Sequence, residues 1–484
     1  MKIKHKIIFG LTLLLSLQLA QGQETEATFT LEECVNYAWE NNLNVRNGQL
    51  TQLNNEIALK QSKFALLPSL GAGGSVGKSF GRSIDPVSNA FVSRDFTTGG
   101  FSANSSVFLY RGGVLRNTIK RNELNLDASE FDLQKAKNDI GLQVATNFLN
   151  VLLNTEQFEN AKYQVEVTSA QLERTKKLVA AGSLPITNQL DLESQLASNE
   201  VQVVNSENAR NLALLNLKQA MQMPANQELN IETPDLNIDQ VSLAMENPSQ
   251  IYEVALDVQP EVKSAELGIE SSDIEVQISK AAFLPSLSLS GSISTNYSDQ
   301  ARQILGQQSV TVPSQEIGFV QGSNATVFSN PQTQLVPIIS DGYQVFDQFN
   351  DNLGQSVRLN LNVPIFSNYS NSANLQRAQI TKQRAEIQSE TVKNQLRQSI
   401  ETAYNSAIAA LKSYEASEKR LKALEESFRA TEQRYNVGGA NFVDYQVANN
   451  NLFAARTDLT RAKYEYIFRA TILDFYLGNP ITLD

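Results

Sequence analysis

Hydrophobic and polar positions follow two periods along the chain, and the two alternate in the same order twice. Apolar residues recur at steps of three and four over long stretches, which is typical of amphipathic helices. Helices are expected at about 32–66, 115–181, 185–222, 249–283, 373–437 and 441–477. Shorter stretches alternate as strands do. Strands are expected at about 69–80, 101–110, 286–297 and 356–366.

The longest helical stretches carry a coiled-coil period. The apolar steps average close to 3.5 residues, as in left-handed supercoils. They run through Leu396, Ile400, Ala403, Ala407, Leu411, Tyr414, Leu421, Leu424, Phe428 and Tyr435, and through Leu126, Leu133, Ile140, Val144, Phe148 and Leu152. A helix of about 65 residues spans about 100 Å, and the two shorter helices of each half, laid end to end, span about as much. Each half is therefore expected to form an antiparallel pair, with one long helix beside two stacked shorter ones.

The two halves are an internal repeat. Residues 62–75 and 279–292 share 9 of 14 residues, including both Leu-Pro pairs at Pro68 and Pro285. Further along, Gly182 matches Gly438 at an offset larger by 39 residues, so an insertion lies between 292 and 363. We expect a first repeat at 23–222, a connector at 223–248 and a second repeat at 249–484. The loop between paired strands is about 81–100 in the first repeat and about 298–355 in the second.

The four expected strands are too few to close a barrel within one chain. Residues 286–297 and 356–366 place apolar side chains on one side and Ser, Asn or Arg on the other. Such alternation is typical of a membrane strand, although a half-buried strand of a soluble protein has the same pattern. Four strands cannot form a closed barrel, and an open edge in lipid leaves backbone groups unsatisfied. Two copies would give about 8 strands and three about 12.

The N-terminal residues have the order of a cleaved secretory signal. Lysines precede an apolar stretch from Ile7 to Leu19, and small residues follow at 20–22. We expect 1–22 to be a signal peptide; an uncleaved anchor is the alternative. The only cysteine, Cys34, is far from the cleavage region, so a lipid anchor there is not supported.

The mature chain is acidic and lacks histidine. Removal of 1–22 leaves 37 basic and 51 acidic residues, a formal charge of −14, and takes away His5, the only histidine. Without histidine and with one cysteine, the chain cannot build the usual zinc sites or Ser-His and Cys-His nucleophiles. We expect no enzyme, no cofactor and no metal site, and the acidic charge disfavours nucleic-acid binding.

The duplicated order of helices and strands, the two Leu-Pro junctions and the glycine turns resemble the TolC-like outer-membrane efflux protein family, the outer membrane factors of tripartite efflux and type I secretion systems. The resemblance covers about 29–480. It implies a homotrimer in which each protomer gives four strands to a 12-stranded barrel in outer-membrane lipid and its helices to a periplasmic tunnel. It also implies a periplasmic adaptor (membrane fusion) protein and an inner-membrane pump of the RND or ABC type as partners. Residues 223–248 would belt the tunnel at its equator, and 298–355 would be an extracellular loop, either a lid or a plain surface loop.

In that family acidic residues at the hairpin tips ring the periplasmic entrance. The matching positions here give a set of gate candidates, turn residues and helix-to-strand junctions. They are Asp444, Asn188, Thr187, Tyr435 and Asp191 for the gate, Gly182, Pro185, Gly438 and Gly439 for the turns, and Pro68 and Pro285 for the junctions. Asp444 also stands three residues after Asn441, where a capping-box acid would stabilise a helix N-terminus. Asn188 and Ala440 replace charged residues of some members, which puts an Arg-to-acid gate link in doubt.

Two functions remain open from the sequence. The first is a passive export duct in the outer membrane with a periplasmic helical part. The second is a non-conducting periplasmic adaptor or structural protein that bridges the membranes with its helical hairpins. The alternating strands favour the duct.

Overall fold

The computed structural model describes residues 28–480 apart from 86, 88, 94, 225 and 235–246. The expected signal segment and residues 225 and 235–246 of the expected connector lie outside the described residues. The chain folds into two compact units. The helical unit takes the described residues of 1–59, 121–273 and 380–484, and the strand unit takes those of 60–120 and 274–379. Each unit therefore draws on both repeats.

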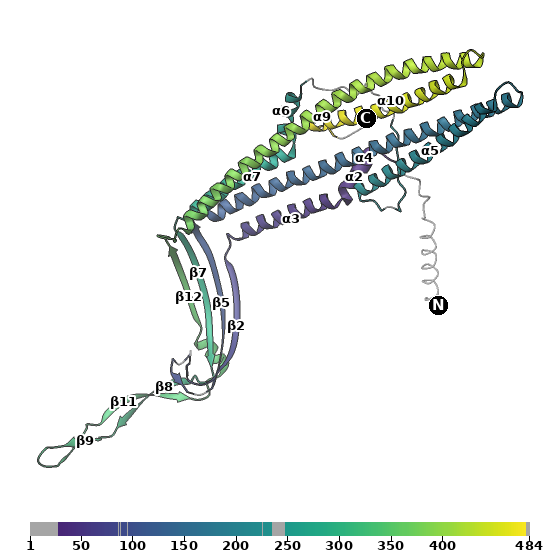
Figure 1. Cartoon of the computed structure of the whole chain (residues 1–484). Helices are drawn as coiled ribbons and strands as arrows, with labels where there is room; N and C mark the ends of the chain where they lie inside the picture. The colour runs from purple at the N-terminus through teal and green to yellow at the C-terminus, as the bar shows by residue number, and fades with distance from the viewer. Residues whose placement is uncertain are drawn as a thin grey trace, which may run out of the picture. The chain divides into compact units, whose positions relative to one another are not determined.

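Long helices dominate the chain (Figure 1). They are α2 (Leu31–Asn41), α3 (Leu43–Phe64), α4 (Val114–Ala180), α5 (Ile186–Met221), α6 (Pro248–Val258), α7 (Pro260–Ala281), α9 (Ser370–Asn436) and α10 (Phe442–Tyr476), with a short α8 (Val345–Asp351) in the strand unit. Within the part of the chain that the structure describes, no helix has the length and apolar content needed to cross a membrane.

The two helices expected at 32–66 and 249–283 are each broken, which corrects the sequence interpretation. Asn42 separates α2 from α3, and Gln259 separates α6 from α7. Both residues are extended, with ψ angles of 131° and 127°. At Gln259 the cause is local, because the next residue is Pro260 and a residue before proline is disfavoured in the helical region. The breaks stand at equivalent positions of the repeat.

Each break is held by a buried amide side chain. Asn42 Nδ2 donates to the carbonyl of Ala220 at 3.2 Å, and Gln259 Nε2 donates to the carbonyls of Phe475 at 3.1 Å and Tyr476 at 3.3 Å. These carbonyls belong to the last turns of α5 and α10, where helix carbonyls run out of intrahelical partners, although the Phe475 carbonyl also accepts from the Gly478 N–H at 3.0 Å. The amides therefore satisfy the ends of the neighbouring helices and fix where the two shorter helices of each half meet.

We expect Gln259→Leu to destabilise the helical unit by about 1–3 kcal/mol, because the Tyr476 carbonyl loses its side-chain donor and the Phe475 carbonyl keeps only the Gly478 N–H. Thermal unfolding followed by far-UV circular dichroism measures the loss. Gln250→Leu is the matched control, since Gln250 is exposed on α6. Equal melting temperatures for the two variants would contradict the role given to Gln259.

The repeat is visible in the hydrophobic core of the helical unit. One cluster joins α2, α3, α4 and α5 and includes Tyr464 and Ile467 of α10, and a second joins α6, α7, α9 and α10. Equivalent positions of the two halves are buried in both clusters: Cys34 and Ile251, Ala38 and Ala255, Val45 and Val262, Ile140 and Leu396, Val144 and Ile400, Val151 and Ala407, Leu217 and Leu473. The two helical hairpins are thus built on one packing plan.

Helix α7 links the two hairpins. Toward α4, Ser271 Oγ donates to Asn125 Oδ1 at 2.6 Å. Toward α9, Lys393 Nζ pairs with Glu266 at 2.9 Å and Lys382 Nζ with Asp273 at 2.7 Å. These ion pairs are solvent-exposed and each contributes little. These two ion pairs fix the register of α7 against α9.

The strand unit is built on one antiparallel sheet of β2 (Ser69–Ser79), β5 (Phe96–Arg111), β7 (Ser286–Ser298) and β12 (Gly354–Asn362), in the order β12-β7-β5-β2. Strand β5 starts earlier than the expected 101, because its glycines at 99 and 100 still pair with β2 and β7. Strand β12 stops at Asn362 and not at 366, since Pro364 has no N–H to donate.

The loops between these strands are partly ordered, which corrects their description as loops. In 298–355 the chain forms β8 (Gln303–Val312), β9 (Glu316–Phe319), β10 (Thr326–Phe328), β11 (Gln332–Ser340) and α8. In 81–100, β3 (Ser83–Ile84) pairs with β4 (Phe91–Val92). The described start of the connector contributes β6 (Asn230–Ile231), which pairs in parallel with β1 (Thr28–Phe29).

Candidate functional site

The four-stranded sheet has one apolar and one polar face, and the strand register produces both. In most rows of paired residues, positions with the same orientation carry the same kind of side chain, although Leu70 pairs with Ser105 and Ile293 with Gln355. The apolar face holds Leu70, Ala72, Val76, Phe101, Ala103, Val107, Leu287, Leu289, Ile293, Val357, Leu359 and Leu361. The polar face holds Ser102, Asn104, Ser106, Ser288, Ser290, Ser292, Ser294, Ser356, Arg358 and Asn360. The weak alternation of the first-half strands becomes clear once they are paired.

The apolar face is uncovered. Leu70 is 83% exposed and Val357 is 79% exposed, and these residues lie on the two edge strands. Burying such side chains against apolar surroundings gains about 1.5–3 kcal/mol each, so leaving them in water is costly. A sheet with a mainly apolar face, interrupted at positions such as Lys78, Ser105 and Gln355, and a Ser- and Asn-rich opposite face suits a boundary between lipid and an aqueous lumen.

The sheet also ends in two free edges. Within the described residues, β2 and β12 each pair with a strand on one side only. In lipid the unpaired N–H and C=O groups of such edges cost several kcal/mol each, so they require partners. Strands β2 and β12 run in opposite directions, and β12 of one copy can therefore pair with β2 of another in the antiparallel sense.

The loop end of the sheet is fastened by buried polar groups. The Ser298 N–H donates to Gln348 Oε1 at 3.0 Å, and Ser298 also contacts the Asp85 carboxylate through its hydroxyl. Gln348 donates in turn to the carbonyl of Tyr343 at 3.1 Å. All three side chains of Asp85, Ser298 and Gln348 are buried. Sequence reasoning missed this cluster, because the three residues lie far apart in apparently plain polar loops.

Both hairpin tips close with the same turn. Gly182 has a φ of 71° and Gly438 a φ of 77°, the left-handed conformation that glycine adopts without steric cost. After each glycine the next N–H reaches back five residues, from Ser183 to Leu178 at 2.8 Å and from Gly439 to Arg434 at 2.7 Å. This is the Schellman arrangement that ends helices α4 and α9.

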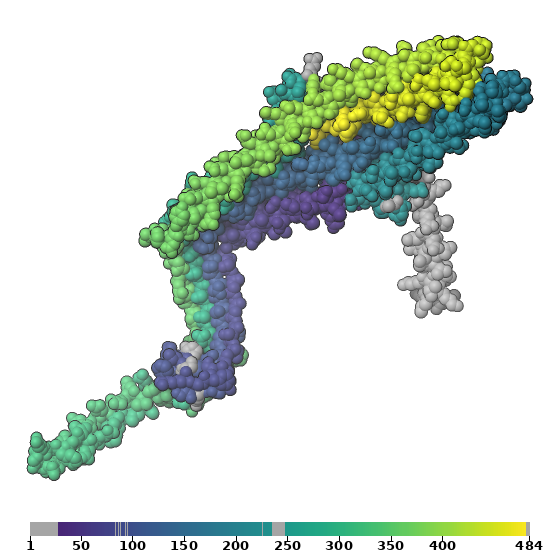
Figure 2. Space-filling view, in the orientation of Figure 1, coloured from purple at the N-terminus to yellow at the C-terminus, as the bar shows by residue number. Residues whose placement is uncertain are grey.

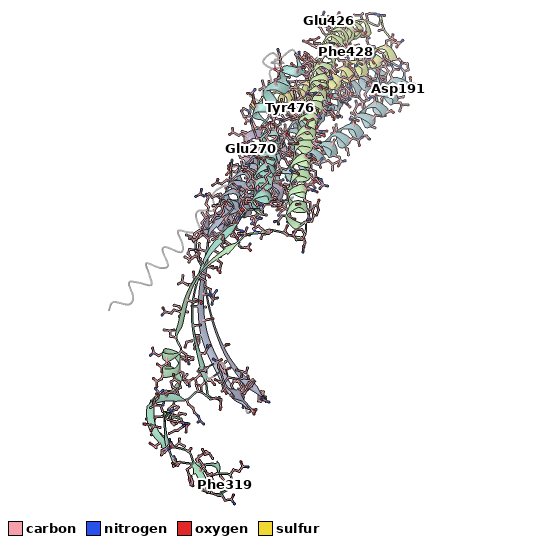
Figure 3. The ribbon with its side chains drawn as sticks, turned by 90° about the vertical axis from the view of Figure 1, so that its left-hand side faces the viewer. Asp191, Glu270, Phe319, Glu426, Phe428 and Tyr476 are labelled. Carbon is pink, nitrogen blue, oxygen red and sulfur yellow. The ribbon has the colours of Figure 1, made fainter. Side chains whose placement is uncertain are left out.

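An aromatic cluster packs the two tips together. Leu172 of α4 and Leu192 of α5 are buried with Phe442 and Tyr445 of α10. The ring of Tyr435 stacks on Tyr445 with centroids 5.0 Å apart. Burial, followed by the nearby charge of Glu432, raises the pKa of Tyr445 to about 12, so its hydroxyl stays protonated. Figure 3 shows Phe428, another member, at the end of the helices where Asp191 lies.

A chain of polar side chains continues the contact between the hairpins. Gln446 of α10 donates to Gln195 of α5 at 3.0 Å, and Gln195 donates to Asn199 at 2.8 Å. Asn199 then donates to Thr168 of α4 at 2.8 Å, where both side chains are buried. Satisfied buried networks of this kind fix a single arrangement of the elements they join. No periodic pattern in the sequence predicts this series of polar side chains.

The gate candidates lie at the tips but do not form one site. Asp444, Thr187 and Asp191 are exposed, Asn188 is half-buried, and Tyr435 is the member that enters the aromatic cluster. In the described part of the chain, no hydrogen bond or ion pair joins these five side chains to one another.

Two details of the tips differ from the sequence interpretation. The Asp444 N–H donates to Asn441 Oδ1 at 2.8 Å, which caps α10, but the return bond of a capping box is found only at Thr30 and Glu33 among the caps described. Pro185 is the N-cap of α5 and not a residue of its first turn, since its ψ is 151°. The α5 cap therefore has no side-chain hydrogen bond, and the two tips are capped differently.

The two junction prolines stand directly before β2 and β7, whose first residues are Ser69 and Ser286. Helices α3 and α7 end at Phe64 and Ala281, before the expected 66 and 283. The residues between are in tight turns, with Leu67 N–H donating to the Phe64 carbonyl at 3.0 Å.

Cys34 is part of the core and is expected to be inert. Its side chain is buried on α2, and burial, with Glu33 as a second cause, raises the pKa of the thiol to about 12. The thiolate is the reactive form, so we expect no labelling by maleimide in the folded protein at neutral pH and full labelling after unfolding in guanidinium. Mass spectrometry of the labelled protein reads this out. Rapid labelling of the native protein would contradict it.

The chain matches known proteins over nearly its whole length. The family model described as "Outer membrane efflux protein" matches residues 35–221 and 251–479. The outer membrane protein TolC of Vibrio cholerae serotype O1 is 21% identical over 427 residues, which is 87% of this chain and 84% of that protein. The structure of CusC gives a TM-score of 0.73 at 17% identity, over 95% of this chain and 96% of that one. VceC from Vibrio cholerae gives 0.70 at 16% identity, over 93% and 96%.

Proposed function

Since the chain belongs to the outer membrane efflux protein family, we propose that three copies join their sheets edge to edge and form one 12-stranded barrel of the outer membrane. The family is one of efflux channels and not of enzymes, and the protein is an outer-membrane efflux channel. Barrel closure pairs β12 of each copy with β2 of the next. The lumen is lined by the polar face of the sheet, and the helical hairpins form the periplasmic tunnel.

The observation that carries this proposal is the sheet with an exposed apolar face and two unpaired edges. Lipid covers the apolar face, and neighbouring copies satisfy the edges. An 8-stranded barrel of two copies would have an interior filled by side chains, whereas 12 strands leave room for a conduit. The lumen face carries small, uncharged serines and asparagines beside the two arginines Arg111 and Arg358, which suits passage of varied molecules.

Transport through such a duct is passive, so its energy comes from partners. The partners we propose are a periplasmic adaptor that docks on the hairpin tips and an inner-membrane pump, proton-driven of the RND type or ATP-driven of the ABC type. Small residues at one tip, Gly438 to Ala440, permit close approach of another helical hairpin. In vivo crosslinking from the tip, followed by mass spectrometry of the captured proteins, tests this. Exclusive capture of cytoplasmic proteins would refute it.

The assembly itself is tested by gel migration and electrical recording. Purified protein in mild detergent should run as a heat-sensitive oligomer about three times the monomer mass and should insert into planar bilayers as discrete conducting steps. The rival function, a non-conducting periplasmic adaptor, would leave the apolar sheet face in water. Recovery of a monomer in the soluble periplasmic fraction would overturn the channel in favour of that rival.

The N-terminal segment and the connector, which lie wholly or partly outside the described residues, also have proposed roles. Residues 1–22 direct secretion and are cleaved, and residues 223–248 belt the tunnel at its equator. N-terminal sequencing of the protein from outer membranes tests the first. A mature N-terminus at Met1 would contradict it.

At the tips, the acidic Asp444 is proposed to contribute to the periplasmic gate. We expect Asp444→Ala to weaken block by multivalent cations applied from the periplasmic side, because the exposed carboxylate is removed from the entrance. Single-channel recording with graded cation concentrations measures this. The effect on stability should be small, up to about 1 kcal/mol, since the Asn441 cap uses the backbone of residue 444 and not its side chain. Unchanged block with a lower melting temperature would assign Asp444 to the helix terminus alone.

A further inference from the structure

The insertion of the second repeat forms a long hairpin of unusual composition. Strands β8 and β11 pair from Gln303 with Ser340 to Val312 with Gln332, and β9 and β10 continue the hairpin to its end. In the described chain, these strands pair only with one another. Figure 2 shows the hairpin as a thin projection without a second layer, and Figure 3 places Phe319 near its far end.

Both faces of the hairpin carry large apolar side chains among Gln, Ser and Thr. The register places Val310, Val336 and Ile338 on one face and Ile304, Leu335 and Ile339 on the other. All six are exposed, with Leu335 at 67% and Ile304 at 68%. A two-stranded hairpin is marginal in water without a hydrophobic face that packs on something. These two faces therefore indicate a covering surface on each side of the hairpin.

Charge on the hairpin is almost absent. Among residues 303–340 only Glu316 is charged. Exposed strands that face water are normally protected by charged side chains such as lysine. Pro337 lies in the middle of β11 and interrupts its backbone donors, so addition of another strand along that edge is disfavoured. Contact is therefore expected through the faces and not through the β11 edge.

The base of the hairpin is fixed to the sheet from which it starts. Arg302 and Asp341 pair across the base at 3.4 Å. Just outside this pair, Thr295 Oγ1 of β7 donates to the carbonyl of Phe349 in α8 at 2.7 Å, and Asn352 donates to the carbonyl of Asn296 at 2.9 Å. A hairpin anchored in this way starts at the same point of the barrel rim in each copy.

We infer that the faces of this hairpin are covered by the same hairpins of the neighbouring copies, which together form a constriction at the mouth of the channel. This inference rests on the proposed trimer. Three identical surfaces can meet only if they carry no strong like charge, and residues 303–340 meet that condition. In a ring each hairpin has one neighbour on either side, so both of its faces are covered by apolar side chains of other copies.

A single cysteine tests the contact. Because Cys34 is buried, Leu335→Cys can be made in the natural chain and treated in outer membranes with a bis-maleimide whose spacer reaches about 10 Å, the separation of packed strand layers. That reach is needed because in a ring the Leu335 face of one copy meets the opposite face of the next. We expect a covalent dimer in most oligomers, at least about tenfold more than for Val357→Cys, which is also exposed in the single chain but faces lipid in the barrel. The natural chain gives the background.

A deletion tests the constriction. Joining Arg302 to Asp341 by a short Gly-Ser link removes the hairpin and keeps its base. The oligomer should persist, and single-channel conductance should rise about twofold or more, because the narrowest part of the mouth is lost. Unchanged conductance would show that the hairpins form no constriction.

Other results would overturn the inference in distinguishable ways. An intact oligomer in which Leu335→Cys forms no dimer and reacts at once with a water-soluble maleimide would show that the hairpin stands free. Labelling of that cysteine by a lipid-tethered probe would assign the hairpin to the membrane surface. Failure of the natural chain to form an oligomer would overturn the proposed function, and this inference with it.

Discussion

Leu359→Arg is expected to abolish insertion of the assembled protein into the outer membrane, whereas Asn360→Arg, one residue along the same strand, should leave it nearly intact. The two positions differ only in the face of β12 on which they lie. Leu359 is on the apolar face and Asn360 on the polar face. Arginine on the lipid face costs about 2–4 kcal/mol near the membrane midplane. The cost applies to every copy of the assembly.

The lumen face already accepts this side chain. Arg358 is the natural neighbour of both positions and lies on the polar face, paired with Ser290 across the strands. The yield of heat-sensitive oligomer from outer membranes, relative to total chain, measures the effect. Equal yields for Leu359→Arg and Asn360→Arg would mean that the apolar face does not meet lipid.

Tyr445→Ala is expected to separate the two helical hairpins at their tips. The ring is buried between Tyr435 and Phe428, with centroids 5.0 and 5.5 Å away. Removal of a buried aromatic side chain costs about 3–5 kcal/mol, because the cavity left behind collapses only in part. This loss of stability is concentrated at the tips, where the structure has few other buried apolar side chains.

Protease sensitivity and conductance read out this change. In Tyr445→Ala, cleavage near the tips should be faster and the channel should spend more time open, since the cluster holds the tips together. Val443→Ala is the control, because Val443 is 64% exposed on α10 at the same tip. If the tips of Tyr445→Ala stay resistant to protease, the hydrogen-bonded polar side chains from Gln446 to Thr168 are sufficient to hold the two hairpins together.

Periodicity was enough to predict the long helices and the positions where they turn. Apolar residues at steps of three and four define a stripe over many helical turns. Glycine at a left-handed C-cap is a signal in the local sequence for the end of a helix, as at Gly182 and Gly438. The repeat also predicted which core positions are equivalent. By contrast, the break at Asn42 depends on a buried hydrogen bond to a residue far along the chain, and no local pattern carries it. The break at Gln259 did have a signal, since Pro260 follows it.

The strand unit was harder to predict for physical reasons. Strand β5 begins in a stretch with Gly99 and Gly100, which have no side chains to alternate. The hairpin of β8 and β11 mixes Gln and Ser with apolar residues on both faces, so it lacks the alternation of a strand with one dry face. Its pairing is seen only when the two strands are placed together.

The turn from strand to helix was also missed. In the first repeat it uses Gly112 and Gly113, both with positive φ; in the second the equivalent residues are Asn368 and Tyr369, with φ of 47° and 65°. The backbone conformation is repeated although the residues are not. A comparison of residue types alone cannot detect such a match.

The central claim is that three copies close one barrel through β12 and β2, and a crosslinking ladder tests it most directly. Ser75→Cys on β2 and Ser356→Cys on β12 place one thiol on each edge strand of the same chain. A bis-maleimide that tolerates a shift of register then joins copies in outer membranes, and denaturing gels count the joined chains. The account predicts bands of one, two and three chains and none larger. A ladder that ends at two, continues beyond three or does not form would contradict it.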